Sequence, residues 1–412
     1  MCCCAKCITR YTVMLYCNET MKLLRHAYIK PGDRVLLRVD FNVDFDRKGR
    51  IVDEYRIRNV LPTIRALLSR KARVILLTHL GDPGPALAHR TGTSTQPIAL
   101  YLSRALRLPV AFASRVIGGI TELAVTNLKP GGVLLLENVR WEPGEVVNDP
   151  GLARKIARLG DIYIFDAFGV AHRNHASCAI LPQLLPSYVG LSLEQELRVL
   201  ARVAQHPKHP LVFVLGGAKI STKLPILRSF IKTADKILLG GALANTLLQR
   251  RGFSIGASLI EKLSSGIESK MISLAHPALL LPIDVLTASS TKSKKFSLRA
   301  VGSVPKGEMI LDVGPDTLAL FSRIIRSARM IFWNGPMGFI ENSIFAQGTE
   351  SLAQVITRSR AFSVVGGGDT LVVLDRMKLL GKFDFVSSGG GAMLAFLAGE
   401  RLPALEALGY YT

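Results

Sequence analysis

Cysteine is scarce over most of this chain. Beyond residue 17 the 412 residues contain a single one, Cys178, while five more lie in the first 17 residues. This distribution excludes a disulfide framework across the fold and favours a reducing, cytoplasmic location. Cys4 and Cys7 form a CxxC pair, but a zinc site usually needs a second pair, and none follows. We expect residues 1–20 to be an extension, either disordered or upstream of a true start at Met14 or Met21.

Long hydrophobic runs are also missing. No stretch reaches the roughly 18 apolar residues of a membrane-spanning helix, and 20% of residues are charged, so we expect no membrane partner. Aromatic residues make up only 7% and are not interleaved with basic ones, as base stacking would require. The net charge of +21 is spread along the chain, with one compact run at Lys292–Lys295. We expect no nucleic-acid partner, and a positive field that attracts an anionic substrate.

What the chain does contain is a regular alternation of short apolar runs with helical patterns. The predicted strands are Arg34–Val43, Arg73–His79, Gly132–Val139, Asp161–Phe168, Leu211–Leu215, Lys236–Leu239, Ala278–Val285, Met330–Trp333, Phe362–Val365 and Phe383–Val386. Predicted helices include Arg56–Arg70, Asp149–Leu159, Thr222–Thr233, Ala242–Arg251, Ser258–Leu274, Thr317–Ser327, Ile344–Ile356 and Thr370–Met377. Continuously apolar strands indicate parallel sheets covered on both faces. The length favours two such α/β domains over one.

The boundary between these domains is expected within Leu191–Pro210. The pattern predicts a helix with Ser192 as its N-cap and Glu194 and Glu196 in its first turn, ending before Pro207. One helix between two α/β halves suits a hinge. We therefore predict an N-terminal domain over 21–190, a hinge helix over 191–207 and a C-terminal domain over 208–390.

Glycine and arginine are divided unevenly between the halves. In the second half, four glycine clusters directly follow apolar runs: LGGAK (215–219), LGGA (239–242), VGGGDT (365–370) and SGGGA (388–392). In the first half, the runs end instead in RVDFN (38–42), THLG (78–81), ENVR (137–140) and DAFGVAHR (166–173). Glycine lets backbone amides approach a polyphosphate, and arginine binds phosphate or carboxylate with paired N–H groups. The second half therefore favours a nucleotide site and the first an anion site.

Candidate nucleotide-binding residues follow the strands of the second half. Lys219 and Lys223 are one helical turn apart after a glycine pair and suit a phosphate tail, although no Walker A spacing is present. Asp369 opens a helix, where it either caps the helix or holds Mg²⁺. Glu341, after the WNGPMG turn (333–338), is either a solvated loop acid or an acceptor for ribose hydroxyls.

Candidate anion-binding residues follow the strands of the first half. Asp40 and Asn42 share one face at a strand end. Arg56 opens the next helix, and Arg140 and Arg173 follow later strands. Three histidines accompany them and are either hydrogen-bonded structural residues, zinc ligands or added positive charge: His79, His172 and His175. We favour a polar anion pocket over a metal site.

No nucleophile motif of the GxSxG type occurs, which suits phosphoryl transfer, because that reaction needs alignment and charge neutralisation more than covalent catalysis. A dehydrogenase is disfavoured, since no GxGxxG opens a first βαβ unit. A regulatory or RNA-binding protein with a nucleotide site remains the alternative that the positive charge suggests. The candidate phosphate- and metal-binding side chains speak against it: Lys219, Lys223, Asp369 and Arg56.

From about Val35 to Leu408 the chain resembles phosphoglycerate kinase. The resemblance is carried, in order, by RVDFNV, YRIRNVLPTIRALL, THLG, LLENVRW, DAFGVAHRNHAS, GGAKISTK, NGPMG, VGGGDT and SSGGGA. It implies two Rossmann-like three-layer domains with parallel sheets joined by a hinge helix, and a C-terminal tail (391–412) that returns to the first domain. It also implies reversible phosphoryl transfer between 1,3-bisphosphoglycerate and MgADP, giving 3-phosphoglycerate and MgATP in glycolysis and gluconeogenesis, by a cytoplasmic enzyme that we expect to be a monomer.

The resemblance assigns roles residue by residue. For 3-phosphoglycerate it implies Asp40, Phe41, Asn42, Arg56, His79, Leu80, Gly81, Asp82, Arg140 and Arg173. For the nucleotide it implies Gly216, Gly217, Lys223, Gly240, Gly241, Asn334, Pro336, Glu341, Gly367, Gly368, Asp369 and Thr370, with Asp369 on Mg²⁺. For stabilising the transferred group it implies Arg56, Lys219 and the amides of Gly389, Gly390 and Gly391.

Two positions depart from the family pattern. HLGRP becomes HLGDP, which places Asp82 where the family has a phosphate-binding arginine, and RVDFNVP becomes RVDFNVD, with Asp44 in place of proline. An acid at position 82 repels an anionic substrate unless another base compensates, and His89 and Arg90 in the following loop are the nearest candidates.

Overall fold

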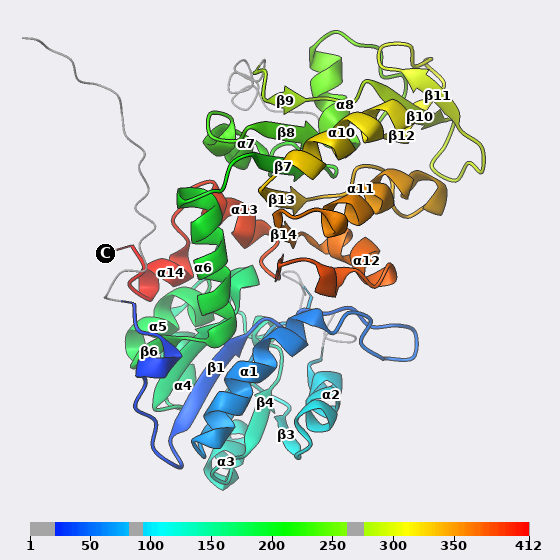
Figure 1. Ribbon diagram of the computed structural model, residues 1–412. Coiled ribbons are helices and arrows are strands. Elements are labelled where there is room, and N and C mark those ends of the chain that lie inside the picture. The colour runs from blue at the N-terminus through cyan, green and yellow to red at the C-terminus, as the bar shows by residue number, and fades with distance from the viewer. Residues whose placement is uncertain (1–20, 82–93, 262–275, 412) are drawn as a thin grey trace, which may run out of the picture.

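The computed structural model describes residues 21–81, 94–261 and 276–411. Its two lobes are each built on a six-stranded parallel sheet (Figure 1). The first sheet has the order β3 (Val110–Ala113), β4 (Val133–Leu136), β2 (Arg73–Leu77), β1 (Arg34–Val39), β5 (Ile162–Asp166), β6 (Ser187–Val189). The second has the order β15 (Phe385–Ser387), β14 (Phe362–Gly366), β13 (Met330–Asn334), β7 (Leu211–Leu215), β8 (Lys236–Leu239), β9 (Leu279–Leu280). The predicted α/β class with two parallel sheets is confirmed.

Helices cover these sheets. In the first half they are α1 (Tyr55–Ser69), α2 (Gln96–Leu106), α3 (Gly119–Asn127), α4 (Pro150–Ala157), α5 (Leu181–Leu184) and α6 (Leu191–Gln205). In the second they are α7 (Leu224–Phe230), α8 (Gly241–Arg250), α10 (Pro315–Ser327), α11 (Gln347–Arg358), α12 (Gly368–Arg376), α13 (Gly391–Leu397) and α14 (Pro403–Ala407). None of the described helices is long and apolar enough to cross a membrane.

The pleat of each strand divides its side chains between two cores. On β1, Leu36 packs on one face of the sheet, while Val35 and Leu37 pack on the other. The Leu36 core continues through α6 and α13 to Phe213 of the second sheet. One apolar cluster thus joins the two lobes along α6, which lies between them in Figure 1.

The N-terminus of α6 is capped in a way the sequence did not predict. The helix begins at Leu191, and Ser192 does not cap it. Instead the Asp166 carboxylate, at the end of β5, accepts a hydrogen bond from the Leu193 amide (2.7 Å), and the Thr63 hydroxyl of α1 accepts one from the Leu191 amide (3.1 Å). The predicted Ser192 cap is therefore wrong, because a buried carboxylate from another element takes its place.

A predicted strand at Ala278–Val285 is divided in the structure. β9 ends at Leu280, and β10 (Asp284–Ala288) begins a separate antiparallel sheet with β11 (Ser297–Ala300) and β12 (Met309–Val313). Pro282 lies at the break, where it has no amide to donate to a sheet. The prediction also missed β3, β6, β11 and β12, and most of the predicted helix Ser258–Leu274 lies outside the described residues.

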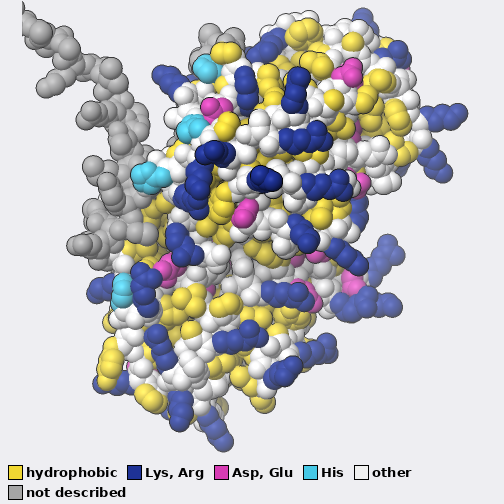
Figure 2. All heavy atoms as spheres, viewed as in Figure 1, with side chains coloured by type: hydrophobic (Ala, Val, Ile, Leu, Met, Phe, Trp, Pro, Cys, Tyr) yellow, Lys and Arg dark blue, Asp and Glu magenta, His cyan; other side chains and the backbone are white. Residues whose placement is uncertain are grey.

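The chain ends against the first lobe. In Figure 1, α13 and α14 lie beside α6 and α5. The Ala404 amide donates to the Ala171 carbonyl (3.1 Å), and the Tyr410 ring is buried against Phe396. Lys and Arg side chains spread over both lobes of the face shown in Figure 2 and form no single patch there.

Candidate active site

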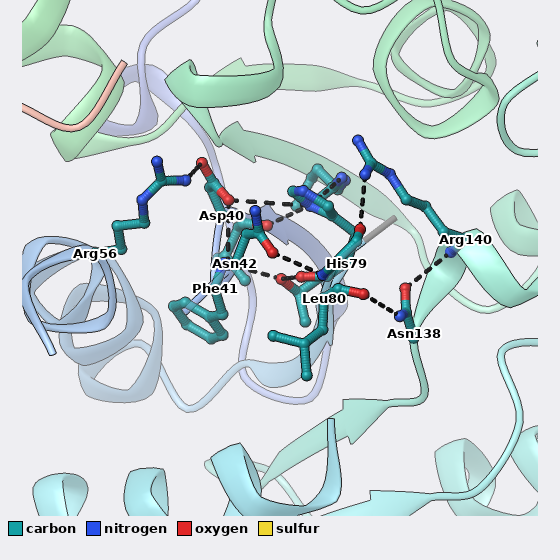
Figure 3. Close-up of polar contacts among 12 residues, drawn as sticks. Asp40, Phe41, Asn42, Arg56, His79, Leu80, Asn138 and Arg140 are labelled. Carbon is teal, nitrogen blue, oxygen red and sulfur yellow. Dashed lines mark hydrogen bonds and ion pairs between the residues drawn. The ribbon is translucent and has the colours of Figure 1, made fainter. Parts of the chain in front are cut away.

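The anion-site candidates of the first lobe meet at the carboxyl ends of its strands. Asp40 follows β1 directly, and its Oδ2 accepts from the Arg56 guanidinium at 2.5 Å. Two residues on, the Asn42 side-chain oxygen accepts from the Gly81 amide (2.7 Å) beyond β2. Asp40, Asn42, His79 and Arg140 converge with Arg56 in Figure 3. Parallel strands produce this convergence, because all their carboxyl ends lie at one edge.

Residues from the end of β4 hold the neighbouring loop. The side-chain amide of Asn138 donates to the Leu80 carbonyl, and the Arg140 guanidinium donates to the Gly81 carbonyl, both at 2.7 Å. The side chains of Phe41 and Leu80 are buried in the core. The prediction that these two residues bind the substrate therefore concerns their backbone atoms. Asp82 lies outside the described residues.

Histidines in this pocket are kept neutral. His79 is 3% exposed, and its pKa is held well below the usual value by burial and by Arg38, Arg140 and Arg56. Burial and nearby arginines likewise lower the pKa of both His172 and His175 to about 4. Arg173 is exposed nearby and contributes to these shifts. The described residues contain no cluster of three or more His, Cys, Asp or Glu that could hold a metal ion.

Sequence reasoning left out one arginine. Arg38 is 1% exposed on β1, and one of its terminal nitrogens lies 3.4 Å from His79 Nδ1. In the sequence, Arg38 is the first residue of RVDFN and lies within the apolar run that forms β1. Only its burial beside His79 identifies it as part of the pocket.

The glycine loop after β15 lies against the first lobe. A Cβ at Gly389 would collide with the Phe168 ring, and a Cβ at Gly169 would come within 3.3 Å of the Ser388 carbonyl oxygen. Gly390 has a φ of 48°, a left-handed value that favours glycine, and Gly391 opens α13 close to His172. The structure therefore brings the predicted catalytic amides beside the anion pocket.

The second lobe holds a cavity of about 460 Å³. Five predicted nucleotide-site residues line it: Gly217, Gly241, Pro336, Glu341 and Asp369. The cavity also has an apolar wall that the sequence did not reveal, formed by Met309, Leu311, Phe339 and Ile340. Such a wall with a few polar groups suits a planar base and its ribose.

Glycines bring the backbone close together beneath this cavity. At Gly216, a Cβ would overlap the Pro336 carbonyl, and at Gly240 one would lie 2.5 Å from the Met337 sulfur. Both positions therefore support the cavity from behind and do not line it. The close approach sets the turn between β7 and α7, from which the two lysines extend.

The two lysines differ in environment. Lys223 is buried, which lowers its pKa, while the Asp369 and Glu261 carboxylates oppose that shift. Its Nζ would lie 3.4 Å from a Cβ at Gly217. Lys219 is exposed. Asp369 lines the cavity, and its charge acts on Lys223. Exposed Lys219 lies close enough to Glu261 to lower the pKa of that carboxyl.

The remaining candidates form a hydrogen-bonded frame. The side-chain amide of Asn334 donates to the Gly366 carbonyl (2.9 Å), and the backbone amide of Gly335 donates to the Thr370 hydroxyl (2.9 Å). Gly367 has a φ of 104°, and a Cβ there would lie 2.6 Å from Asn334. Gly368 begins α12, so its amide lies at the helix N-terminus, where an anion is favoured.

Comparison with known proteins supplies the family. The family profile described as "Phosphoglycerate kinase" matches residues 28–400. The chain is 43% identical over 380 residues to a phosphoglycerate kinase of Desulforudis audaxviator, covering 92% of this chain and 96% of that one. It is 40% identical over 391 residues to that of Pelotomaculum thermopropionicum, covering 94% and 98%.

A solved structure agrees with these sequence matches. The fold superposes on phosphoglycerate kinase from Coxiella burnetii with a TM-score of 0.79 and 36% identity, covering 94% of this chain and 99% of that one. The profile spans most of the chain, and both lobes and both pockets are included in the match. The chain therefore belongs to the phosphoglycerate kinase family.

Proposed function

We propose that the two pockets together carry out the family reaction, in which a phosphoryl group passes reversibly between 1,3-bisphosphoglycerate and MgADP. The chain is a phosphotransferase that acts on a carboxyl group and serves glycolysis and gluconeogenesis. One observation carries the assignment of the site. The glycine loop 388–391, at the carboxyl edge of the second sheet, lies against Gly169 and beside His172 of the anion pocket.

In this proposal the first pocket binds 3-phosphoglycerate. Arg56, Arg140 and Arg173 supply positive charge, and neutral His79 supplies a hydrogen-bond donor. Asp40 would lie beside the substrate, and its ion pair with Arg56 fixes the guanidinium at the pocket edge, which reduces the entropy lost when substrate binds.

The second pocket would bind the nucleotide. Its apolar wall receives the base, Glu341 accepts from ribose hydroxyls, and Lys223 with the α12 N-terminus contacts the phosphates. Asp369 fits Mg²⁺, because magnesium commonly uses one or two protein carboxylates and completes its shell with phosphate oxygens and water. It lines the cavity beside Lys223. The ion would neutralise phosphate charge there.

Transfer between the pockets requires no general base, because a carboxylate attacks or leaves. Catalysis instead requires that the negative charge on the phosphoryl oxygens be neutralised. Arg56, Lys219 and the amides of residues 389–391 would do this. One preorganised donor of this kind contributes about 3–4 kcal/mol, and alignment about 7–11 kcal/mol. Water must also be excluded, or the acyl phosphate hydrolyses.

We propose that α6 acts as the hinge between domains at 21–190 and 208–390, and that bending closes the cleft. Its position supports this role. The cap from Asp166 ties its start to the first lobe, and Glu196 accepts from the Ser388 amide (2.7 Å) at the glycine loop. We further propose that the tail 391–412 belongs with the first domain and that the protein acts as a cytoplasmic monomer.

The test is an assay of the pure protein. We expect ADP-dependent release of 3-phosphoglycerate from 1,3-bisphosphoglycerate, with loss of activity in EDTA and recovery on adding Mg²⁺. Asp369→Asn should raise the Mg²⁺ concentration needed for half-maximal rate, whereas Asp316→Asn, at the start of α10, should not. Absence of ATP formation, or an Mg²⁺ requirement that Asp369→Asn leaves unchanged, contradicts the corresponding assignment.

A further inference from the structure

A buried arginine lies beneath the anion pocket without a direct acidic partner. Arg38 donates through Nε to the Ser177 hydroxyl (3.0 Å) and through Nη1 to the Val39 and Leu77 carbonyls. No carboxylate among the described residues bonds to it directly. A buried guanidinium without a counter-charge is costly, so its compensation must come through an intermediate group.

Glu145 provides that compensation through Ser177. Its carboxylate is fully buried and accepts from the Ser177 hydroxyl at 2.6 Å and from the Ser177 amide at 3.0 Å. A serine hydroxyl has one proton and two lone pairs. Because the Ser177 hydroxyl donates its hydrogen bond to Glu145, its oxygen is oriented to accept one from Arg38. Negative charge thus reaches the guanidinium across one hydroxyl.

The other end of Arg38 meets a histidine. Its Nη2 lies 3.4 Å from His79 Nδ1. Arginine only donates hydrogen bonds, so Nδ1 must accept and the ring proton must lie on Nε2. Asp40 Oδ1 is 3.9 Å from the same Nδ1, too far for a hydrogen bond, and that carboxylate is engaged by Arg56 and the Asn42 amide. Arg38 therefore decides the tautomer.

The tautomer matters because of what the pocket binds. No described residue accepts a hydrogen bond from His79 Nε2, so this N–H is available to an anion. The opposite tautomer would present a lone pair to the anion and repel it. Burial among arginines keeps the ring neutral, which leaves the position of its single proton as the property that decides between attraction and repulsion.

We propose that Glu145 and Ser177 are positioning residues which, through Arg38, hold His79 as the Nε2–H tautomer that donates to the anionic substrate. Neither touches the substrate. The inference rests on the proposed function of the anion pocket for its substrate, but the tautomer itself is a property of the free protein.

The experiment reads the tautomer by long-range ¹H–¹⁵N NMR of the ¹⁵N-histidine-labelled full chain, with His79→Gln to assign the signal. We expect the Nε2–H pattern in the wild type and a mixture or the Nδ1–H pattern in Ser177→Ala. The KM for 3-phosphoglycerate should rise about tenfold in Ser177→Ala, as for loss of one hydrogen bond to a charged group, while kcat stays within about twofold. Ser177→Thr, which keeps the hydroxyl, should restore both readouts.

Two results would overturn the proposal: an Nδ1–H tautomer in the wild type, or an unchanged Nε2–H tautomer in the folded Ser177→Ala protein. If Ser177→Ala does not fold, Glu145→Gln decides by the same tautomer readout, because it removes the charge and keeps the shape. A protein that shows the expected tautomer shifts but forms no ATP would refute the proposed function and leave the Glu145–Ser177–Arg38–His79 link intact.

Discussion

The two pockets are built by opposite means. In the first lobe, buried charged and polar side chains hold one another in place, as Glu145, Ser177, Arg38 and His79 do. In the second, backbone packs directly on backbone, as at Gly216 and Gly241. The first should therefore be sensitive to the loss of a charge or hydrogen bond, and the second to added volume.

The largest expected effect separates chemistry from binding. Arg56→Ala and Lys219→Ala should each lower kcat about 100- to 1,000-fold, or about 3–4 kcal/mol, because each removes charge that acts in the transition state. KM should change much less, and steady-state kinetics with both substrates would show it. Arg58→Ala is the matched control, since the Arg58 side chain is 70% exposed and pairs with Glu54, the N-cap residue of the same helix. A defect mainly in KM for both Arg56→Ala and Lys219→Ala would refute their catalytic role.

The next effect tests added volume where the two lobes meet. Gly389→Ala places a methyl group against the Phe168 ring and should displace the loop, with about a 100-fold fall in kcat/KM. Gly391→Ala meets nothing closer than His172 at 3.8 Å and should stay within about threefold in the same assay. Equal losses in the two variants would show that volume is not the decisive property of this loop.

The free energy of unfolding should depend on pH in opposite directions for a titrating group of each pocket. Burial lowers the pKa of His175 to about 4, so the folded state binds fewer protons than the unfolded state between about pH 4 and 6.5, and stability rises with pH there. Asp312 lines the cavity of the second lobe, and burial raises its pKa to about 7. The folded state therefore binds more protons than the unfolded state between about pH 4 and 7, and stability falls as pH rises there.

Denaturant unfolding of two variants between pH 5 and 8 measures this difference. Relative to wild type, Asp312→Asn should gain stability as pH rises, while His175→Gln should lose its relative stability as pH rises. Each slope is at most about 1.4 kcal/mol per pH unit. Slopes of the same sign would contradict the contrast between the pockets.

The smallest effect concerns the departure from the family pattern. Asp82→Arg should lower the KM for 3-phosphoglycerate about two- to fivefold, because it replaces a negative charge with a positive one. Asp82→Asn, which removes the acid without adding a base, should give part of that gain. An unchanged or higher KM in Asp82→Arg would mean that the position has been re-used.

Much of this molecule could be predicted from the chain alone. Apolar runs such as Leu211–Leu215 are long enough and continuous enough to be strands buried on both faces, and the polar or glycine-rich residues after them had to lie at the carboxyl edges of the sheets. The structure agrees for β1, β2, β7 and β14. The prediction failed for short or divided strands, because neither β3 nor the break at Pro282 has a periodic signal long enough to detect.

Local pattern therefore determined the class of fold, the order of the elements and the residue types available to each pocket, since periodicity and turn chemistry act within a few residues. Contacts between distant residues decided the rest. The cap on α6 comes from Asp166, the counter-charge for Arg38 lies more than 100 residues away at Glu145, and Gly389 stops against Phe168. Burial and hydrogen-bond partners at such separations depend on how the sheets pack, so no window of sequence contains them.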